Sequence, residues 1–121
     1  MKKRILVVEN NKDILELISF VLDQAGYEFS LFTSETGIFD HIAEFQPDVI
    51  LLDIIKPTIY GSELCKQIKD TYSTHHIPVI VLSTHPHIQK VKDVCADEIV
   101  EKPFDIDGLL DAISASLKKA S

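Results

Sequence analysis

The sequence has no excess of basic residues, and this shortage removes two classes of binding partner. Its 121 residues include 12 Lys and Arg against 19 Asp and Glu, which gives a formal net charge of −7 at pH 7. Nucleic acids and anionic lipid surfaces both select for patches of Lys and Arg, and this balance supplies few of them. We therefore expect no direct binding of nucleic acid and no membrane association. The same acidity suits a site that binds cations.

Long hydrophobic runs are also missing. The longest apolar stretches, such as Val49–Leu52 and Ile77–Leu82, are far shorter than the roughly 20 residues that a helix needs to cross a bilayer. The basic start, Met1–Arg4, leads directly into a short strand-like run rather than into the apolar core of a signal peptide. The simplest expectation is a cytoplasmic protein.

Cysteine is scarce as well. Cys65 and Cys95 lie 30 positions apart and form no CxxC pair, so we expect two buried, small apolar side chains rather than a disulfide or a zinc site. The histidines at positions 75, 76, 85 and 87 come in close pairs but lack further ligands at a zinc-site spacing. They are interpreted as loop residues.

Only four glycines are present, and they form no Gly-rich phosphate-binding loop. This absence argues against a nucleoside triphosphate or a dinucleotide as the ligand. The length predicts one domain with a single core over residues 1–121. No linker, repeat or low-complexity tract interrupts it.

What the sequence does contain is a regular alternation of two apolar patterns. Short runs rich in branched residues predict strands, and the segments between them carry apolar residues at helical spacing. The predicted strands are 5–8, 28–32, 49–52, 79–82 and 98–100, of which the second and the last lie nearer the sheet edges. The predicted helices place their apolar residues within 14–22, 38–45, 64–68, 88–94 and 106–117. The fold class is therefore α/β, a (βα)5 doubly wound sheet of five parallel strands.

Two of these helices have a clear apolar stripe. The residues expected to face the core are Ile14, Leu17, Ile18, Val21 and Leu22 in the first helix, and Ile106, Leu109, Leu110, Ile113 and Leu117 in the last. The first stripe is interpreted as core rather than as a groove for a partner.

Polar residues follow the predicted strands at their carboxyl ends, where doubly wound sheets bind their ligands. In chain order they are Glu9 and Asn10, Asp53, Ser83 and Thr84, and Lys102. Carboxylates, hydroxyls and an ammonium group match the needs of phosphoryl transfer to an aspartate. That reaction requires a carboxylate nucleophile, oxygen ligands for Mg²⁺ and donors for the oxygens of the transferred group.

Four separated motifs follow one another in register along the chain. They are Ile5–Asn10, Pro47–Asp53 followed by Pro57 and Gly61, Pro78–Ser83, and Ala96–Glu98 with Lys102–Phe104. Together they resemble the receiver domain of two-component response regulators. The resemblance covers essentially the whole chain, and it implies a chemotaxis-type, flavodoxin-like fold with strand order 2-1-3-4-5.

The resemblance also implies roles for single residues. Asp53 is expected to accept a phosphoryl group from a sensor histidine kinase or a phosphotransfer protein. Ser83 is expected to move towards the phosphoryl oxygens, and Lys102 to pair with Asp53 before phosphorylation and with the phosphate after it. The peptide bond between Lys102 and Pro103 resembles the family's cis bond, a geometry that is essentially confined to X-Pro.

The same resemblance implies a bound metal ion and a protein or domain that receives the signal. Glu9, Asp53 and the backbone carbonyl of Ile55 are expected to ligate Mg²⁺, which keeps Asp53 ionised beside a second carboxylate. The chain is expected to act as a switch rather than as an enzyme that turns over external substrates. Its output then lies in a partner protein, or in an output domain that is absent from this sequence.

Several positions depart from the family pattern. Asn10 stands where a second acidic residue is usual, so it contributes weakly or through water and Mg²⁺ binding is expected to be weaker. Ile99 replaces a common aromatic switch residue, and the stretch from Ser83 to Lys102 is about three residues shorter than usual, which loops tolerate. Thr84 stands where a smaller residue is common, beside the phosphoryl group, and narrows access to Asp53. An apolar Ile55 offers no hydrogen bond to an attacking water, so slow hydrolysis is expected.

Less specific interpretations remain open. Asp53 can be a turn former after a buried strand, and Lys102 a solvated surface lysine. Asn10 or Asn11 can serve as the N-cap of the first helix. The main functional alternative is a degenerate receiver that binds proteins independently of phosphorylation, which Asn10 and Ile99 favour. A small flavodoxin-like enzyme is a third class, but the chain lacks a cofactor loop.

Overall fold

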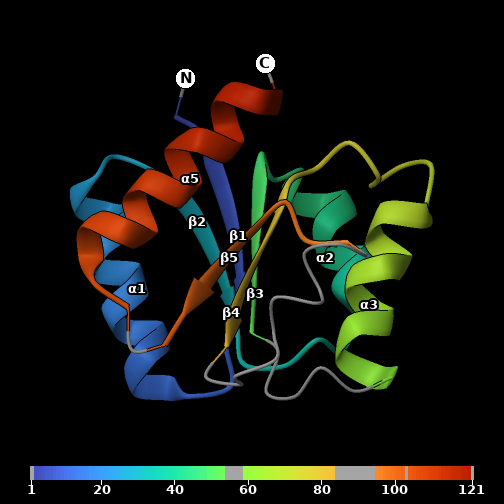
Figure 1. The fold of residues 1–121 in the computed structure, drawn as a ribbon, viewed down its shortest axis with the longest axis horizontal. Helices are drawn as coiled ribbons and strands as arrows, with labels where there is room; N and C mark the ends of the chain where they lie inside the picture. The colour runs from blue at the N-terminus through green and yellow to red at the C-terminus, as the bar shows by residue number, and fades with distance from the viewer. Residues whose placement is uncertain (1, 54–58, 84–94, 103, 121) are drawn as a thin grey trace.

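Five parallel strands form one sheet in the order β2-β1-β3-β4-β5 (Figure 1). The coordinates are a computed structural model that describes residues 2–53, 59–83, 95–102 and 104–120. The strands are β1 (Arg4–Val8), β2 (Glu28–Phe32), β3 (Val49–Asp53), β4 (Val79–Ser83) and β5 (Glu98–Glu101). The helices are α1 (Lys12–Gln24), α2 (Ile38–Phe45), α3 (Ile59–Asp70) and α5 (Ile106–Ala120). The predicted flavodoxin-like α/β fold and its strand order are confirmed, with β2 and β5 at the edges.

Helices cover both faces of this sheet. In Figure 1, α1 and α5 lie on one side, and α2 and α3 lie on the other. Side chains alternate between the faces along each strand. In β1, for example, Ile5 and Val7 join the cluster under α1 and α5, while Leu6 and Val8 join the cluster under α2 and α3. Each strand at the centre of the sheet is buried on both faces, which explains its continuous apolar run.

Helix α1 begins and ends where local chemistry dictates. The side chain of Asn11 accepts hydrogen bonds from the backbone N–H groups of Asp13 (3.0 Å) and Ile14 (3.1 Å), so Asn11 and not Asn10 is the N-cap. Just after the helix, Gly26 has a φ of +85°, a conformation that glycine adopts without a steric penalty.

The expected core stripes of the two long helices need partial correction. In α1 the buried residues are Leu15, Ile18, Val21 and Leu22. Leu17 is 45% exposed, because it points away from the sheet together with Phe20, which is 62% exposed. In α5, Leu109 and Ile113 are buried as expected, but Ile106 at the first turn is 47% exposed. The core stripes are therefore narrower than the apolar pattern alone indicates.

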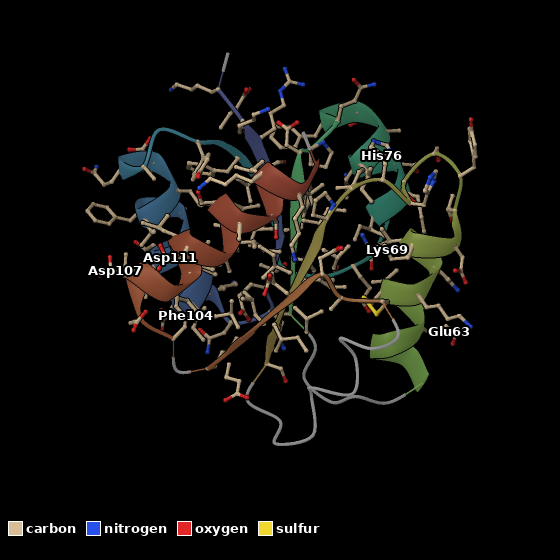
Figure 2. The ribbon with its side chains drawn as sticks, turned by 45° about the horizontal axis from the view of Figure 1, so that its top comes forward. Glu63, Lys69, His76, Phe104, Asp107 and Asp111 are labelled. Carbon is tan, nitrogen blue, oxygen red and sulfur yellow. A yellow bond between two sulfur atoms is a disulfide. The ribbon has the colours of Figure 1, made fainter. Side chains whose placement is uncertain are left out.

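The prediction for the two cysteines is confirmed for their burial but is wrong about the disulfide. Cys65 and Cys95 are indeed buried, with 0% and 7% exposure, but their sulfur atoms form a disulfide (Figure 2). The bond joins α3 to the chain that enters β5, and the two Cα atoms are 5.7 Å apart. Spacing along the sequence could not reveal this, because the pairing depends on how α3 packs beside the sheet.

The helix predicted within 88–94 lies outside the described residues. In the described part of the chain, no helix has the length and apolar character that a membrane span requires.

Candidate functional site

The candidate site lies at the edge of the sheet where the parallel strands end. Figure 1 shows these carboxyl ends together at the lower edge of the sheet. Asp53 is the last residue of β3, Ser83 is the last of β4, Glu9 follows β1 directly, and Lys102 follows β5 directly. A doubly wound topology therefore brings together residues that are up to 93 positions apart in the sequence, from Glu9 to Lys102.

Lys102 lies between two buried carboxylates. Its Nζ is 2.5 Å from Oε1 of Glu9 and 3.0 Å from Oδ1 of Asp53. The side chains of Glu9, Asp53 and Lys102 are 0%, 5% and 10% exposed. With all three groups ionised, two negative charges face one positive charge. The site therefore carries an excess negative charge in a place that water reaches poorly.

Burial and the neighbouring carboxylate both act on the pKa of Glu9. Burial raises the pKa of the Glu9 carboxyl, and although Lys102 and the backbone N–H of Asn11 lower it, the neighbouring Asp53 carboxylate raises it further. The net direction is upward from the ordinary value of 4.5. A second cation near Oε1 and Asp53 would remove this penalty, since an added positive charge favours the ionised form of both carboxylates.

Backbone hydrogen bonds hold the ends of the site in place. The N–H of Glu9 donates to the carbonyl of Phe32 at 3.0 Å, which continues the pairing of β1 with β2. The N–H of Lys102 donates to the carbonyl of Ser83 at 2.8 Å, which continues the pairing of β4 with β5. Glu9 also accepts a hydrogen bond at Oε2 from the N–H of Asn11 at 3.1 Å. Glu9 and Lys102 are therefore positioned by the sheet rather than by flexible loops.

The two asparagines after β1 have different surroundings. Asn11 caps α1, whereas Asn10 is exposed, and its backbone N–H approaches Oδ2 of Asp53 at 3.5 Å. Asn10 therefore stands at the rim of the carboxylate cluster without adding a charge to it. The competing interpretation of Asn10 as an N-cap is wrong.

Ser83 is 1% exposed and ends β4, in register with Glu101 of β5. Three of the other predicted features, Ile55, Thr84 and the Lys102–Pro103 bond, fall outside the described residues or depend on one that does. The same holds for His85 and His87. Ile99, at the position of the usual aromatic residue, is half-buried and packs against the core cluster under α2 and α3.

The donor set suits a hard divalent cation. Glu9 and Asp53 offer carboxylate oxygens, which Mg²⁺ prefers, and Mg²⁺ commonly completes its octahedron with water. Within the described part of the chain, no group of three or more His, Cys, Asp or Glu side chains is arranged to hold a metal ion. His75 and His76 lie in the turns between α3 and β4, as predicted, and the ring Nδ1 of His75 is 2.7 Å from the Tyr72 carbonyl.

Sequence reasoning missed two contacts of lysines. It predicted that Lys102 pairs with Asp53, but not that Lys102 also pairs with Glu9. It also assigned no role to Lys69, whose Nζ contacts Asp97 and donates to the Ile77 carbonyl at 2.8 Å. The signal for the first was present, because β1, β3 and β5 all end at one edge and a lysine side chain is long.

Comparison of the sequence with known protein families identifies the family of the chain. The family profile described as the response regulator receiver domain matches residues 5–114. The chain is a member of the receiver domain family. Receiver domains belong to two-component signalling systems, so the predicted family is confirmed.

Solved receiver structures share the fold along nearly the whole chain. NtrX from Brucella abortus is 27% identical with a TM-score of 0.85, over 99% of this chain and 27% of that one. A CheY-like response regulator receiver domain protein from Methanospirillum hungatei JF-1 is 23% identical with a TM-score of 0.86, over 99% of this chain and 97% of that one. The receiver domain of the sensor histidine kinase PA1611 from Pseudomonas aeruginosa PAO1 is 20% identical with a TM-score of 0.84, over 98% and 99%. That last receiver has a magnesium ion coordinated in its active site cleft.

Proposed function

We propose that this receiver is a phosphorylation-dependent switch in which Asp53 accepts a phosphoryl group from a sensor histidine kinase or a phosphotransfer protein. The observation that carries the proposal is the buried contact of Lys102 with both Asp53 and Glu9 at the carboxyl edge of the sheet. A carboxylate at the end of a strand, next to a fixed ammonium group, is a nucleophile with a charge partner for the incoming phosphate.

The transfer requires one bond to form and one to break. An oxygen of Asp53 bonds to phosphorus as the bond between phosphorus and the donor imidazole nitrogen breaks, and the imidazole leaves with the electron pair. Lys102 neutralises charge on the phosphoryl oxygens, and Ser83 and Thr84 supply hydroxyl donors to them. Glu9 balances Lys102 before transfer, and it releases part of that contact when the added negative charge attracts the ammonium group.

Mg²⁺ is the proposed cofactor. Glu9, Asp53 and the backbone carbonyl of Ile55 would hold it, with Asn10 contributing weakly or through a water molecule. When bound, the ion supplies positive charge that neutralises the phosphoryl oxygens. The contact of two buried carboxyl groups with a single ammonium group supports this assignment, and the pKa of Glu9 is raised, first by burial and then by the neighbouring Asp53.

The proposal also covers the extent of the domain, its location in the cell and its output. Residues 1–121 form one receiver domain that works in the cytoplasm and does not turn over external substrates. Its output is a protein contact, either with a partner protein or with an output domain outside this sequence. Direct binding of nucleic acid is not part of it, because the chain carries a net charge of −7.

Incubation of the protein with acetyl phosphate and Mg²⁺ tests this proposal by intact mass. We expect the mass of one phosphoryl group to be added to the wild type and to an Asp40→Ala variant, whose substitution removes an exposed carboxylate of α2. Asp53→Ala should gain none. Phosphorylation of Asp53→Ala to the wild-type extent would refute the assignment.

The second candidate is a degenerate receiver that binds a partner independently of phosphate. Exposed Asn10, which adds no charge to the cluster, and apolar, half-buried Ile99 favour it. If the wild type gains no phosphoryl mass at any Mg²⁺ concentration that leaves the protein folded, this candidate replaces the first.

A further inference from the structure

We propose that Cys65 and Cys95 form a redox-modification site, a reversible dithiol–disulfide pair whose oxidation favours the unphosphorylated form of the receiver. The reversible pair stands on its own, whereas its effect on phosphorylation rests on the function proposed for Asp53. The pair joins α3 to the chain entering β5 (Figure 2), whereas the residues of the carboxylate cluster lie at the carboxyl ends of β1, β3 and β5.

Both redox states are compatible with the fold. The two side chains are 0% and 7% exposed and belong to the apolar cluster under α2 and α3, with Ile68, Val79 and Val81. Reduced cysteine behaves as a small hydrophobic residue, so two thiols can occupy this place without burying an unpaired charge. Reduction therefore removes a covalent bond but no essential part of the core.

A second contact holds the same junction when the disulfide is open. Lys69 lies one helical turn after Cys65 in α3, and its Nζ contacts Asp97, two residues after Cys95. Asp97 in turn accepts a hydrogen bond from the N–H of Val79 at 2.8 Å, and its own N–H donates to the Val79 carbonyl at 2.9 Å. This ion pair and these hydrogen bonds keep α3 beside the start of β5, so we expect the dithiol form to stay folded.

The Cys65–Cys95 disulfide is connected through the chain to residues of the candidate site. The covalent ring that it closes runs from Cys65 to Cys95 and includes β4 with Ser83 at its end. Seven residues after Cys95 the chain reaches Lys102, which here pairs with Glu9 and Asp53 as it would before phosphorylation. The disulfide is therefore closed in the arrangement without phosphate, and it restrains α3 relative to the chain entering β5, so a phosphorylated form with a different spacing between them would be disfavoured while the bond is closed.

The chemistry is thiol–disulfide exchange with a dithiol such as dithiothreitol. A thiolate of the reductant bonds to one sulfur of the pair, the Cys65–Cys95 bond breaks, and the departing sulfur takes up a proton. The second thiol of the reductant then displaces the remaining cysteine, so two protein thiols and one oxidised, disulfide-containing reductant are formed. In the cytoplasm such pairs are typically transient and redox-sensing, which fits the proposed location.

The first experiment tests reversibility on the whole chain. The protein is equilibrated with reduced and oxidised dithiothreitol at a series of ratios, then denatured and alkylated, and the labels are counted by intact mass. We expect a smooth conversion between zero and two labels that is the same in both directions, with native circular dichroism throughout. Reduction should lower the melting temperature by roughly 10 °C, because it opens a loop whose ends are separated by 30 positions in the sequence. Two labels at every ratio, or loss of the native signal on reduction, would overturn the proposal.

The second experiment tests the effect on phosphorylation. Oxidised and reduced wild type are incubated with acetyl phosphate and Mg²⁺, with Cys65→Ala and Cys95→Ala as variants that cannot form the bond. We expect the steady-state ratio of phosphorylated to unphosphorylated protein to be about five-fold higher in the reduced form and in both variants than in the oxidised form. In the other direction, phosphorylation should shift the dithiol–disulfide equilibrium towards the dithiol, and Asp53→Asn must abolish that shift.

The outcomes separate the two proposals. If neither redox form gains phosphate, the proposed function fails and the effect on phosphorylation fails with it, while a reversible titration still establishes the redox site. If both forms gain phosphate equally, the function stands and the effect on phosphorylation is refuted.

Discussion

Two lysines of this receiver each contact an aspartate, but their surroundings differ. Lys69 and Asp97 face each other one to one, and each also holds a backbone group, the Ile77 carbonyl and the Val79 N–H. Lys102 is more buried and is shared by Asp53 and Glu9, so its cluster has two carboxyl groups for one ammonium group. The first arrangement is balanced and joins α3 to β4 and β5. The second has fewer cationic than acidic groups, which is what the Mg²⁺-assisted phosphoryl transfer proposed above would need.

The largest expected effect comes from removing each lysine in turn. We expect Lys102→Ala to slow phosphorylation of Asp53 by acetyl phosphate about 10²-fold, because the charge partner of the phosphoryl oxygens is lost. Lys69→Ala should leave the rate within about two-fold, since Lys69 contacts Asp97 rather than the cluster. Phosphorylated protein is followed by intact mass over time at saturating Mg²⁺.

The same pair of variants supplies its own control for folding. Thermal melts show whether each variant is folded at the assay temperature, so a slow rate in folded Lys102→Ala reports on chemistry. If Lys69→Ala slowed the reaction as much as Lys102→Ala, the contrast between a structural and a reactive lysine would be wrong.

The next effect concerns the charge of the cluster. Asn10→Asp should increase Mg²⁺ affinity by about ten-fold, because it adds an anionic oxygen at the rim of the proposed Mg²⁺ site, beside the carboxylates of Glu9 and Asp53. Asn11→Asp is the matched variant, since it adds the same charge one residue later while keeping a good N-cap for α1. Calorimetric titration of both variants and the wild type measures the difference. Equal affinities for the two variants would mean that net charge, rather than a ligand position, controls binding.

Most of the architecture was readable from the sequence because its causes are local and periodic. Parallel strands buried on both faces, such as Val49–Asp53, are continuous apolar runs, and this pattern with alternating helices allows few topologies. The rule for carboxyl ends then identified the edge where Glu9, Asp53 and Lys102 meet, and motifs in register named the family.

What the sequence could not supply depends on distances between elements. The Cys65–Cys95 bond and the Lys69–Asp97 pair both require the exact seating of α3 against the chain entering β5, which no local pattern encodes. The exposure of Leu17 had a different cause. A stripe of apolar residues predicts a buried face, but the width of that face is set by the neighbouring helix and sheet.

The smallest expected effect is a change in the free energy of unfolding, with opposite signs for a substitution in the Glu9–Asp53–Lys102 cluster and one in the Lys69–Asp97 pair. Because the pKa of Glu9 is raised in the folded protein, folding favours its protonated form. The stability that Glu9 contributes is therefore full below the ordinary value of 4.5 and is lost as the pH rises through the raised folded pKa. Glu9→Gln removes this pH dependence, so we expect the free energy of unfolding of the variant to gain about 1 kcal/mol on that of the wild type between pH 4.5 and pH 7.5 without Mg²⁺.

Asp97→Asn should instead lower that free energy by about 1 kcal/mol, because it leaves Lys69 without its charge partner in a half-buried place. Urea denaturation of both variants and the wild type at pH 4.5, 6.0 and 7.5 measures the two changes in the free energy of unfolding. The gain from Glu9→Gln should grow with pH and should shrink when Mg²⁺ is added, since the ion binds the folded wild type and stabilises it. A gain that is the same at every pH would show that Glu9 is not held above its ordinary pKa, and the cluster would then need no second cation.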